Sequence, residues 1–543
     1  MIYNFFDIFN IILSVIGFIG VGSVFIEKNI FSSFIAGIVI SAAIISPLSY
    51  YDVSLVKYVI WLQILLGLFI SFIWFIKNKN YINVKKNFHI IVKFLVTFIF
   101  FLVLLRSLHY QNYVYDTHDL LYFSWVAELI NAEYTGPIRL SVSWPNEMAV
   151  NHLLPGSMLA SIGIFISQPS MLSIIEIRYL LISASLASYT LYLLNIYRFN
   201  FIRTLALFMI FHIFSDAIIL EITISSFAYL IILFEILRRI FNSNQNDKEL
   251  LFFSIMLIIA KAPIFLIASL MACWFIFNKG VKNLSLSSYF AGFLVMINII
   301  SWAIVQSPSG TDASFSIALP YDIRSILGLA SLPSWALENA VTGFIKFLFN
   351  KPFLIMVTII YIFLKYYYLY FVFRDKNLNI NQNKQSNLSY NIKIKGLDIY
   401  FLTSLFSFVL IRNGWDIGHQ AHSFLLSSVI IVTIIFIYYA KNLSNMNMLI
   451  LSFIFILHAI YSNPINPLKK YMENKSNNYT TVKFNEIKIL NDINYNKFYK
   501  PKIKDSVTIS QIKASLLGMK IDSKQYPSPL KNNQITRWII WKN

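Results

Sequence analysis

The sequence is poor in cysteine and in charged residues. Cys273 is the only cysteine among 543 residues, so no disulfide can form within the chain and thiol chemistry is not indicated. Charged residues make up 13% of the chain, against about 25% in a typical soluble domain. This little charge cannot cover the surface of a water-soluble protein of this size.

Apolar residues take the place of the missing charge. The chain is 57% hydrophobic and 17% aromatic, with a mean hydropathy of +0.64. Apolar runs of roughly 18 to 25 residues recur, and each can cross about 30 Å of hydrocarbon as a helix. The composition therefore predicts an all-α polytopic membrane protein of about 12–14 transmembrane helices, because helices satisfy their own backbone hydrogen bonds in lipid. The expected segments are 8–26, 30–48, 55–76, 89–106, 151–168, 172–195, 203–215, 217–237, 250–277, 286–306, 352–373, 398–412, 420–440 and 445–461.

The formal net charge of +19 indicates topology and not nucleic-acid binding. Lysine and arginine lie mostly in short loops between apolar runs, the pattern typical of cytoplasmic loops. Lysines at 77–86 and basic residues at 374–395 place these two loops inside. Counting crossings from them places residues 107–150, 307–350, 413–419 and the tail from about 462 outside.

Arginines at 198, 203, 238 and 239 also favour the inner side, which disturbs this count. Residues 203–237 then form an outward hairpin, and residues 151–195 begin outside and end inside. That stretch allows one full crossing and one segment that only dips into the membrane. Since non-spanning backbone at depth needs surrounding protein or a wet cavity, a cavity is predicted near 151–168.

Lys261 and Pro263 interrupt the apolar run 250–277. A proline and a lysine in mid-run predict two half-length helices that meet at a polar break. A lysine at such depth is costly unless it is paired, and Glu221 or Asp216 could be its partner. Lys261 could instead extend its ammonium group to the outer surface.

The predicted outer loop 107–150 carries two carboxylates, Asp116 and Asp119. Apolar residues from Leu120 to Ile130 suit a helix that lies along the membrane interface with Asp119 at its N-terminal end. A carboxylate at headgroup depth can deprotonate an acceptor hydroxyl that attacks a lipid-linked sugar. The alternative is a helix N-cap for Asp119 and a solvated loop position for Asp116.

The residues around Asp119 carry a family resemblance. Phe123 follows four positions on, Ala127 eight on, then Pro137, and a His152-Leu-Leu-Pro155 element opens the next apolar run. This arrangement resembles the first outer loop of GT-C membrane glycosyltransferases, such as the protein mannosyltransferase and aminoarabinose transferase types. The second proline that family members show after the histidine is missing here.

Later blocks extend the resemblance over about residues 89–280. Arg178 precedes a small-residue-rich helix and a basic turn, and a lysine, here Lys261, breaks a following apolar helix. The three helices before residue 89 are an addition to the usual arrangement. The acidic pair also departs from the adjacent Asp-Glu that many members carry.

The resemblance implies an integral membrane glycosyltransferase of a bacterial cytoplasmic membrane, with its active site outside. It implies transfer of a sugar from a polyprenyl-phosphate-linked donor to an extracytoplasmic acceptor, which is a cell-surface glycan, a lipid or a protein. Asp119 would be the base that activates the acceptor, with Asp116 as the second choice. Membrane lipids are the other expected partners.

A lipid-linked phosphate needs cationic partners. The expected donor-phosphate residues are Arg412, His419, His422 and Lys261, and the expected substrate-cavity residues are His118, His152 and Glu221. The histidines at 419 and 422 could instead anchor a helix end at the interface. No carboxylate or thiol nearby completes a metal site, so none is predicted, although a divalent cation could assist transfer.

Four regions follow from these assignments. They are residues 1–88, the additional helices; 89–306, the GT-C-like catalytic module with outer loop 107–150; 307–461, the C-terminal helices with outer loop 307–350; and 462–543, a small extracytoplasmic α/β domain. Two other functions fit the same sequence. One is an O-antigen or capsule polysaccharide polymerase or ligase, favoured by GHQAHSFLL, and the other is a lipid-linked oligosaccharide flippase or transporter.

Overall fold

The computed structural model describes about two fifths of the chain, mostly before residue 307. Single positions at 126, 362, 402, 446, 450 and 453 are also described. The described segments are 5–26, 29–49, 52–77, 84–109, 113–114, 145–165, 171–197, 226–241, 247–260, 265–279, 284–306, 395–400 and 481–482.

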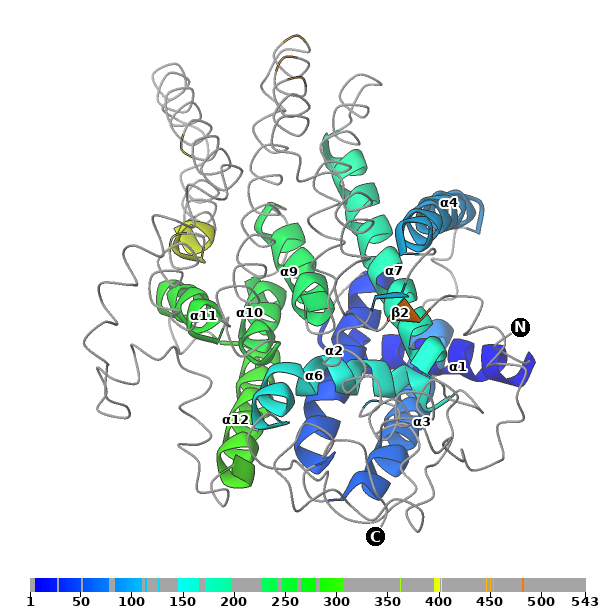
Figure 1. The fold of residues 1–543 in the computed structure, drawn as a ribbon. Helices are drawn as coiled ribbons and strands as arrows, with labels where there is room; N and C mark the ends of the chain where they lie inside the picture. Colours follow the sequence, from blue (N-terminus) through cyan, green and yellow to red (C-terminus); the bar gives the residue numbers. More distant parts are fainter. Residues whose placement is uncertain are drawn as a thin grey trace, which may run out of the picture.

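These segments are helical apart from one two-stranded ladder (Figure 1). The elements are α1 (Phe5–Ser23), α2 (Ile30–Ser49), α3 (Val53–Lys77), α4 (Val84–His109), β1 (Tyr113–Val114), α6 (Pro145–Gly163), α7 (Met171–Tyr197), α9 (Ser226–Phe241), α10 (Asp247–Met256), η2 (Leu257–Ile259), α11 (Phe265–Lys279), α12 (Leu286–Gln306) and β2 (Thr481–Val482). The predicted helical class is confirmed for this part of the chain.

Two of the described helices, α2 and α3, are long and apolar enough to cross a membrane. They differ in their surroundings, because 83% of the apolar window of α2 is buried but only 28% of that of α3. A helix as buried as α2 also suits the core of a soluble protein. The apolar face of α3 has no such cover, and it includes Leu62, Leu65, Phe69 and Phe72, each more than half exposed.

Glycines let α1 pack closely on α2 and α3. A Cβ atom on Gly37 of α2 would lie 2.0 Å from the carbonyl oxygen of Phe18, and one on Gly20 of α1 would lie 1.8 Å from that of Gly67. No side chain fits at either position, so backbone meets backbone as in close helix pairs of membrane proteins. The pairing makes α2 antiparallel to α1, and α3 parallel to it.

A ladder of buried serines joins α2 to α6. Ser46 donates a hydrogen bond to Ser157 at 2.8 Å, and the Ser41 and Ser161 hydroxyls lie 3.1 Å apart. On the other side of α2, Asn298 of α12 donates to the carbonyl oxygen of Ala43 at 2.8 Å. The centre of this bundle is therefore held by hydrogen bonds from small polar side chains.

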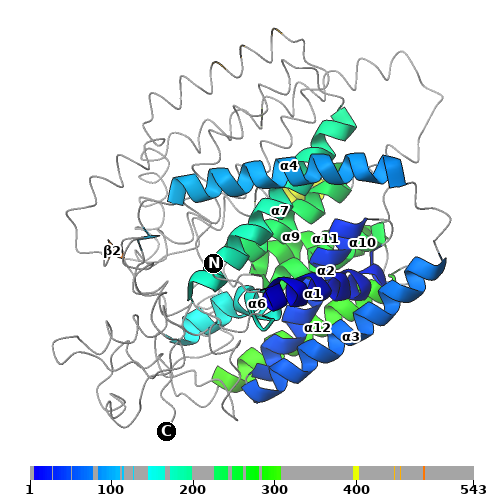
Figure 2. The same cartoon turned by 90° about the vertical axis from the view of Figure 1, so that its right-hand side faces the viewer.

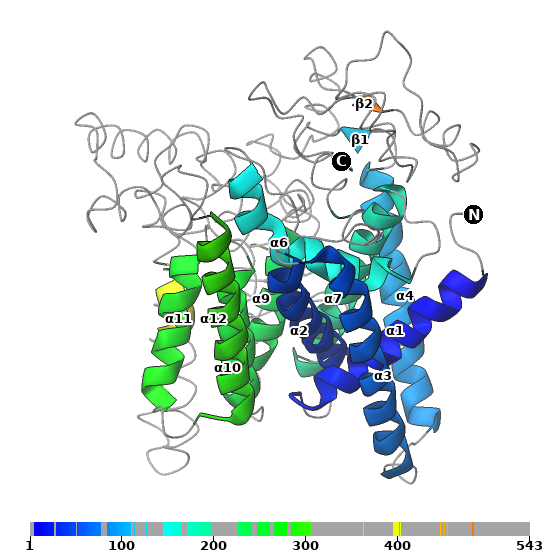
Figure 3. The same cartoon turned by 90° about the horizontal axis from the view of Figure 1, so that it is seen from below.

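The serine pairs also fix the depth of α6. Ser157 pairs with Ser46, and Ser161, further along α6, pairs with the earlier residue Ser41, so α6 is antiparallel to α2. Since α6 ends at Gly163, it ends near the middle of α2. Its first turns extend beyond the end of α2 at Ser49, as Figure 3 shows. Thus α6 passes along only half of α2, in the region where a dipping segment is expected.

The helices α10 and α12 both begin at the end of the bundle where α1 ends and α2 begins. The ring of Phe25, just after α1, stacks on Phe252 of α10 at 5.8 Å and on Phe290 of α12 at 5.1 Å. The chain must therefore return between Ile259 and Leu286, and α11 provides the return. The predicted break at Lys261 and Pro263 lies outside the described residues, between η2 and α11.

Several helix ends gather at this level. The start of α2 contacts the end of α9 through Ser32 and Glu235, and the end of α7 contacts α9 through Ser188 and Arg238. Phe31 of α2 also lies against Phe94 in the first half of α4. The end of α3, the start of α4, the end of α7, the end of α9 and the start of α10 therefore lie at one common end of the bundle.

On one flank of the bundle α4 lies against α7, and α3 lies on the opposite flank with α1 and α2 between (Figure 2). In the predicted C-terminal domain only β2 is described. It pairs antiparallel with β1, with Tyr113 opposite Val482 and Val114 opposite Thr481. Residues 113–114 of loop 107–150 and residues 481–482 of the tail, two regions that are both expected outside, thus lie side by side.

We predict that Gly37→Ala destabilises the protein by about 1–3 kcal/mol, because a new methyl group must displace the α1 backbone. Thermal unfolding of the purified protein measures this change. Gly292→Ala in α12 is the matched control, since nothing lies within 4 Å of its Cβ position. Equal melting temperatures for the two variants would contradict the close packing of α1 on α2.

Candidate functional site

The described part of the chain has one dense group of buried charges. Four side chains form it, Glu235, Arg238 and Arg239 near the end of α9 and Glu249 at the start of α10. Both arginines and Glu235 are at most 2% exposed, and Glu249 is 5% exposed. Two positive and two negative charges balance, which removes most of the cost of burying them.

Arg239 is the better paired of the two arginines. It donates from Nε to Glu249 Oε2 at 2.9 Å and from Nη1 to Glu235 Oε2 at 2.7 Å. Its Nη1 also donates to the Glu235 carbonyl oxygen, and its guanidinium lies 4.5 Å from the ring centre of Phe253. Charge-assisted bonds at these distances neutralise Arg239 and tie α9 to α10.

Arg238 has no carboxylate within hydrogen-bond distance among the described residues. Its nearest carboxylate oxygen is Glu235 Oε1 at 3.8 Å, and its hydrogen bonds go to hydroxyls, Ser188 at 2.6 Å and Ser32 at 3.2 Å. Its Nε is buried without a hydrogen-bond partner, a state that costs about 1–3 kcal/mol. Its positive charge is therefore less compensated than that of Arg239.

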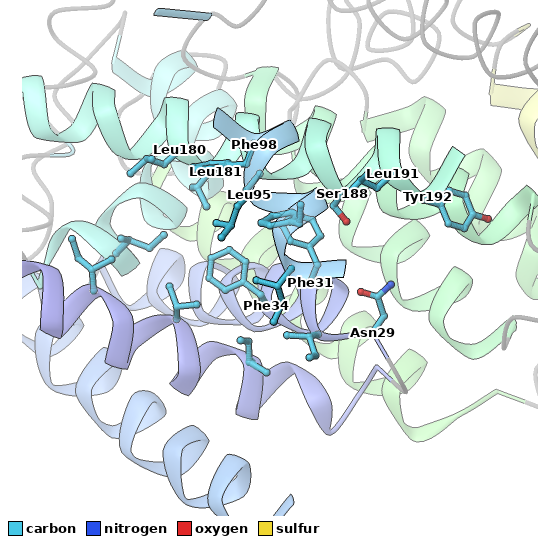
Figure 4. A pocket seen from close by; sticks show the side chains of 18 of the residues that line it. Asn29, Phe31, Phe34, Leu95, Phe98, Leu180, Leu181, Ser188, Leu191 and Tyr192 are labelled. Atoms are coloured by element: carbon cyan, nitrogen blue, oxygen red, sulfur yellow. The ribbon is translucent and has the colours of Figure 1, made fainter. Parts of the chain in front are cut away.

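Arg238 lines a cavity of about 740 Å³, a size typical of small-molecule sites. The cavity lies between α1, α2, α4 and α7, with Ile162 from α6 and Arg238 from α9. Figure 4 shows Phe31, Phe34, Leu95, Phe98 and Leu181 around it. The lining residues are Ile11, Val15, Ile19, Asn29, Ile30, Phe31, Phe34, Ile91, Phe94, Leu95, Phe98, Ile162, Ile177, Leu180, Leu181, Ala184, Ser188, Leu191, Tyr192 and Arg238.

The polar lining residues lie together at one end of this cavity. They are Asn29, Ser188, Tyr192 and Arg238, and Figure 4 shows the first three towards one side. The guanidinium of Arg238 also lies 5.3 Å from the ring centre of Tyr192, whose hydroxyl donates to the Arg238 carbonyl oxygen. The remaining wall is hydrocarbon, so the cavity has one cationic, hydrogen-bonding end and one apolar end.

Most predicted site residues lie outside the described residues. These are Asp116, His118, Asp119, Glu221, Lys261, Arg412, His419 and His422. His152 is placed in α6 by its backbone, five residues before Ser157 of the serine ladder. Among the residues that the structure describes, no group of three or more His, Cys, Asp or Glu side chains could hold a metal ion.

In the sequence, Arg238 and Arg239 indicated only the topology of the chain. Their spacing from Glu235, three and four residues, was the available signal, because side chains at these spacings meet on one face of a helix. Ionisable residues next to an apolar run also mark functional or paired positions. The partners Ser32, Ser188 and Glu249 come from other helices, and no local pattern indicates them.

Comparison of this chain with models of known protein families, with curated proteins and with solved structures finds no match.

We predict that Glu249→Leu lowers the stability by about 3 kcal/mol or more, because it leaves the buried Arg239 with one carboxylate. The double variant Arg239→Met with Glu249→Leu should recover much of this loss, since it removes a positive and a negative charge together. Thermal unfolding measures both changes. Lys248→Gln, an exposed change next to Glu249, is the control. Additive losses in the double variant would contradict a coupled pair.

Proposed function

We propose that the chain is a polytopic membrane protein that transfers a sugar from a polyprenyl-phosphate-linked donor to an extracytoplasmic acceptor. The uncovered apolar face of α3 carries the membrane part of this proposal. The helix has 25 residues and is about 37 Å long, and its outward side is hydrocarbon while serines and charged groups lie inside the bundle. This polarity suits a surrounding of lipid, not of water.

Basic residues at the gathered helix ends support the proposed orientation of the chain across the membrane. Lys77 ends α3, Lys85 and Lys86 begin α4, and Arg238 and Arg239 end α9, all at the end of the bundle where α2 begins. Clustering of basic residues at one end is typical of the cytoplasmic side. The ladder between β1 and β2 places part of loop 107–150 beside the tail, in agreement with a common outer side for both.

The placement of α6 supports sugar transfer on that outer side. This helix follows the loop that carries Asp116 and Asp119, and it reaches only to the middle of α2. Because α6 begins beyond the outer end of α2, the chain that precedes it joins the bundle at the level where a lipid-linked sugar would lie. The order of α4, acidic loop, α6 and α7 is also the order of the blocks that resemble GT-C glycosyltransferases.

In the proposed reaction Asp119 accepts the proton of an acceptor hydroxyl as its oxygen attacks the anomeric carbon of the donor. The bond from that carbon to the phosphate oxygen breaks, and the lipid phosphate leaves with the bonding electrons. Arg412, His419 and His422 are the proposed partners of the phosphate charge. Asp119 raises the nucleophilicity of the acceptor by general-base catalysis.

The orientation is testable by cysteine labelling in a Cys273→Ser background. A membrane-impermeant maleimide added to intact cells should label Asn112→Cys, just after α4, and not Lys79→Cys, between α3 and α4. Detergent should open Lys79→Cys to the reagent. The unsubstituted Cys273→Ser parent gives the background signal. Labelling of Lys79→Cys in intact cells would contradict the proposed orientation.

For the chemistry, we predict that Asp119→Asn lowers transfer at least about 100-fold, because the amide cannot accept a proton. Cells that carry each variant are compared by mass spectrometry of surface glycans and lipid-linked sugars. Asp52→Asn, between α2 and α3 at the same side of the bundle, is the matched control and should retain transfer. Full activity of Asp119→Asn would exclude the proposed role of this carboxylate.

A further inference from the structure

The cavity lined by Arg238 lies away from the proposed transfer site. Its polar residues belong to the ends of α7 and α9 and the start of α2, the basic end of the bundle. The loop with Asp116 and Asp119 follows the far end of α4. A donor sugar held near Asp119 would leave this cavity free, so it is a separate site.

The polar end of the cavity has the chemistry of an anion site. Arg238 is 2% exposed, and its Nε has no hydrogen-bond partner. Ser188 and Ser32 place hydroxyls beside the same guanidinium, and the ring of Tyr192 lies 5.3 Å from it. A guanidinium with spare N–H donors and neighbouring hydroxyls matches a phosphate oxygen in charge and in hydrogen-bonding geometry.

The apolar end has the length of a lipid chain. Lining residues of α7 run from Ile177 to Tyr192, a rise of about 22 Å along the helix. One leaflet of a bilayer contributes about 15 Å of hydrocarbon. A chain that starts at Arg238 therefore reaches past the bilayer centre, between the aromatic side chains of α2 and α4.

The cavity is open towards the surroundings of the bundle. Ile30 of α2 and Ile91 and Leu95 of α4 line it, yet they are 65%, 53% and 47% exposed. An apolar opening at these side chains faces the hydrocarbon of the membrane. A lipid can enter sideways without leaving the bilayer.

We propose that this cavity binds an acidic lipid of the cytoplasmic leaflet, with its phosphate on Arg238 and Ser188 and one chain along α7. The inference rests on the membrane part of the proposed function and not on sugar transfer. Anionic lipids and basic protein pockets meet on this side of bacterial membranes. A phospholipid and a polyprenyl phosphate share the required chemistry, a phosphate on a hydrocarbon chain.

The test is lipid binding by the full-length protein in detergent, measured by native mass spectrometry with defined lipids. Phosphatidylglycerol and undecaprenyl phosphate are the acidic probes, and phosphatidylcholine is the zwitterionic control. We expect at least ten-fold tighter binding of an acidic probe than of phosphatidylcholine. A preference of the same size between the two acidic probes identifies the source of the lipid. Equal binding of all three would overturn the proposal.

Two variants distinguish binding of the lipid headgroup from binding of the lipid chain. Arg238→Gln should weaken binding of the acidic probe at least ten-fold, with Lys57→Gln, an exposed lysine on α3, as the control for charge. Ala184→Trp, which fills the apolar part of the cavity, should weaken binding of every chain-bearing probe. Val103→Trp on the exposed face of α4 is its control.

If Arg238→Gln does not fold, Ser188→Ala and Ala184→Trp decide the question. Wild-type affinity in both would overturn the proposed site. The result is independent of the transfer experiment, because Asp119→Asn should bind the lipid as the wild type does. Loss of transfer with intact lipid binding, or the reverse, therefore shows which of the two proposals fails.

Discussion

The pairing of Arg239 with Glu235 and Glu249 is the contact on which the described bundle depends. It joins the end of α9 to the start of α10. Glu235 also accepts a hydrogen bond at 2.6 Å from the Ser32 hydroxyl of α2, so the same group of contacts includes α2. In an apolar surrounding such bonds are strong, and an unpaired member would be costly. The positions of α2, α9 and α10 relative to one another are therefore tightly specified, and so is the wall of the cavity that Arg238 lines.

Small residues complete this arrangement where charge is absent. Glycines allow the backbones of α1, α2 and α3 to touch, and serines of α2 and α6 bond across their interface. Close packing and side-chain hydrogen bonds can hold helices together where burial of apolar surface gains little, as in lipid. In the proposed membrane setting, lipid would surround the large apolar side chains on the outside of α3, such as Phe69 and Phe72.

The two proposed sites use opposite ends of the bundle. Sugar transfer is assigned to the outer end, near the loop that follows α4 and the half-depth helix α6. The acidic-lipid site is assigned to the basic end, where Arg238 has hydroxyl partners and an apolar cavity beside it. The helix α7 contributes Ser188 and Tyr192 to the second site and lies against α4, so a lipid bound along α7 would stabilise the contact between these two helices.

The sequence by itself determined the helical class of the described part and the approximate extents of α1 to α4. These follow from hydropathy, helix breakers and loop charge, which act over short stretches of chain. Only the tertiary structure decided that α6 stops at the middle of α2, that α11 returns the chain to the start of α12, and that Arg238 meets Ser32 and Ser188 beside a cavity. Those contacts join residues more than two hundred positions apart. Their geometry depends on how whole helices pack, which no local pattern specifies.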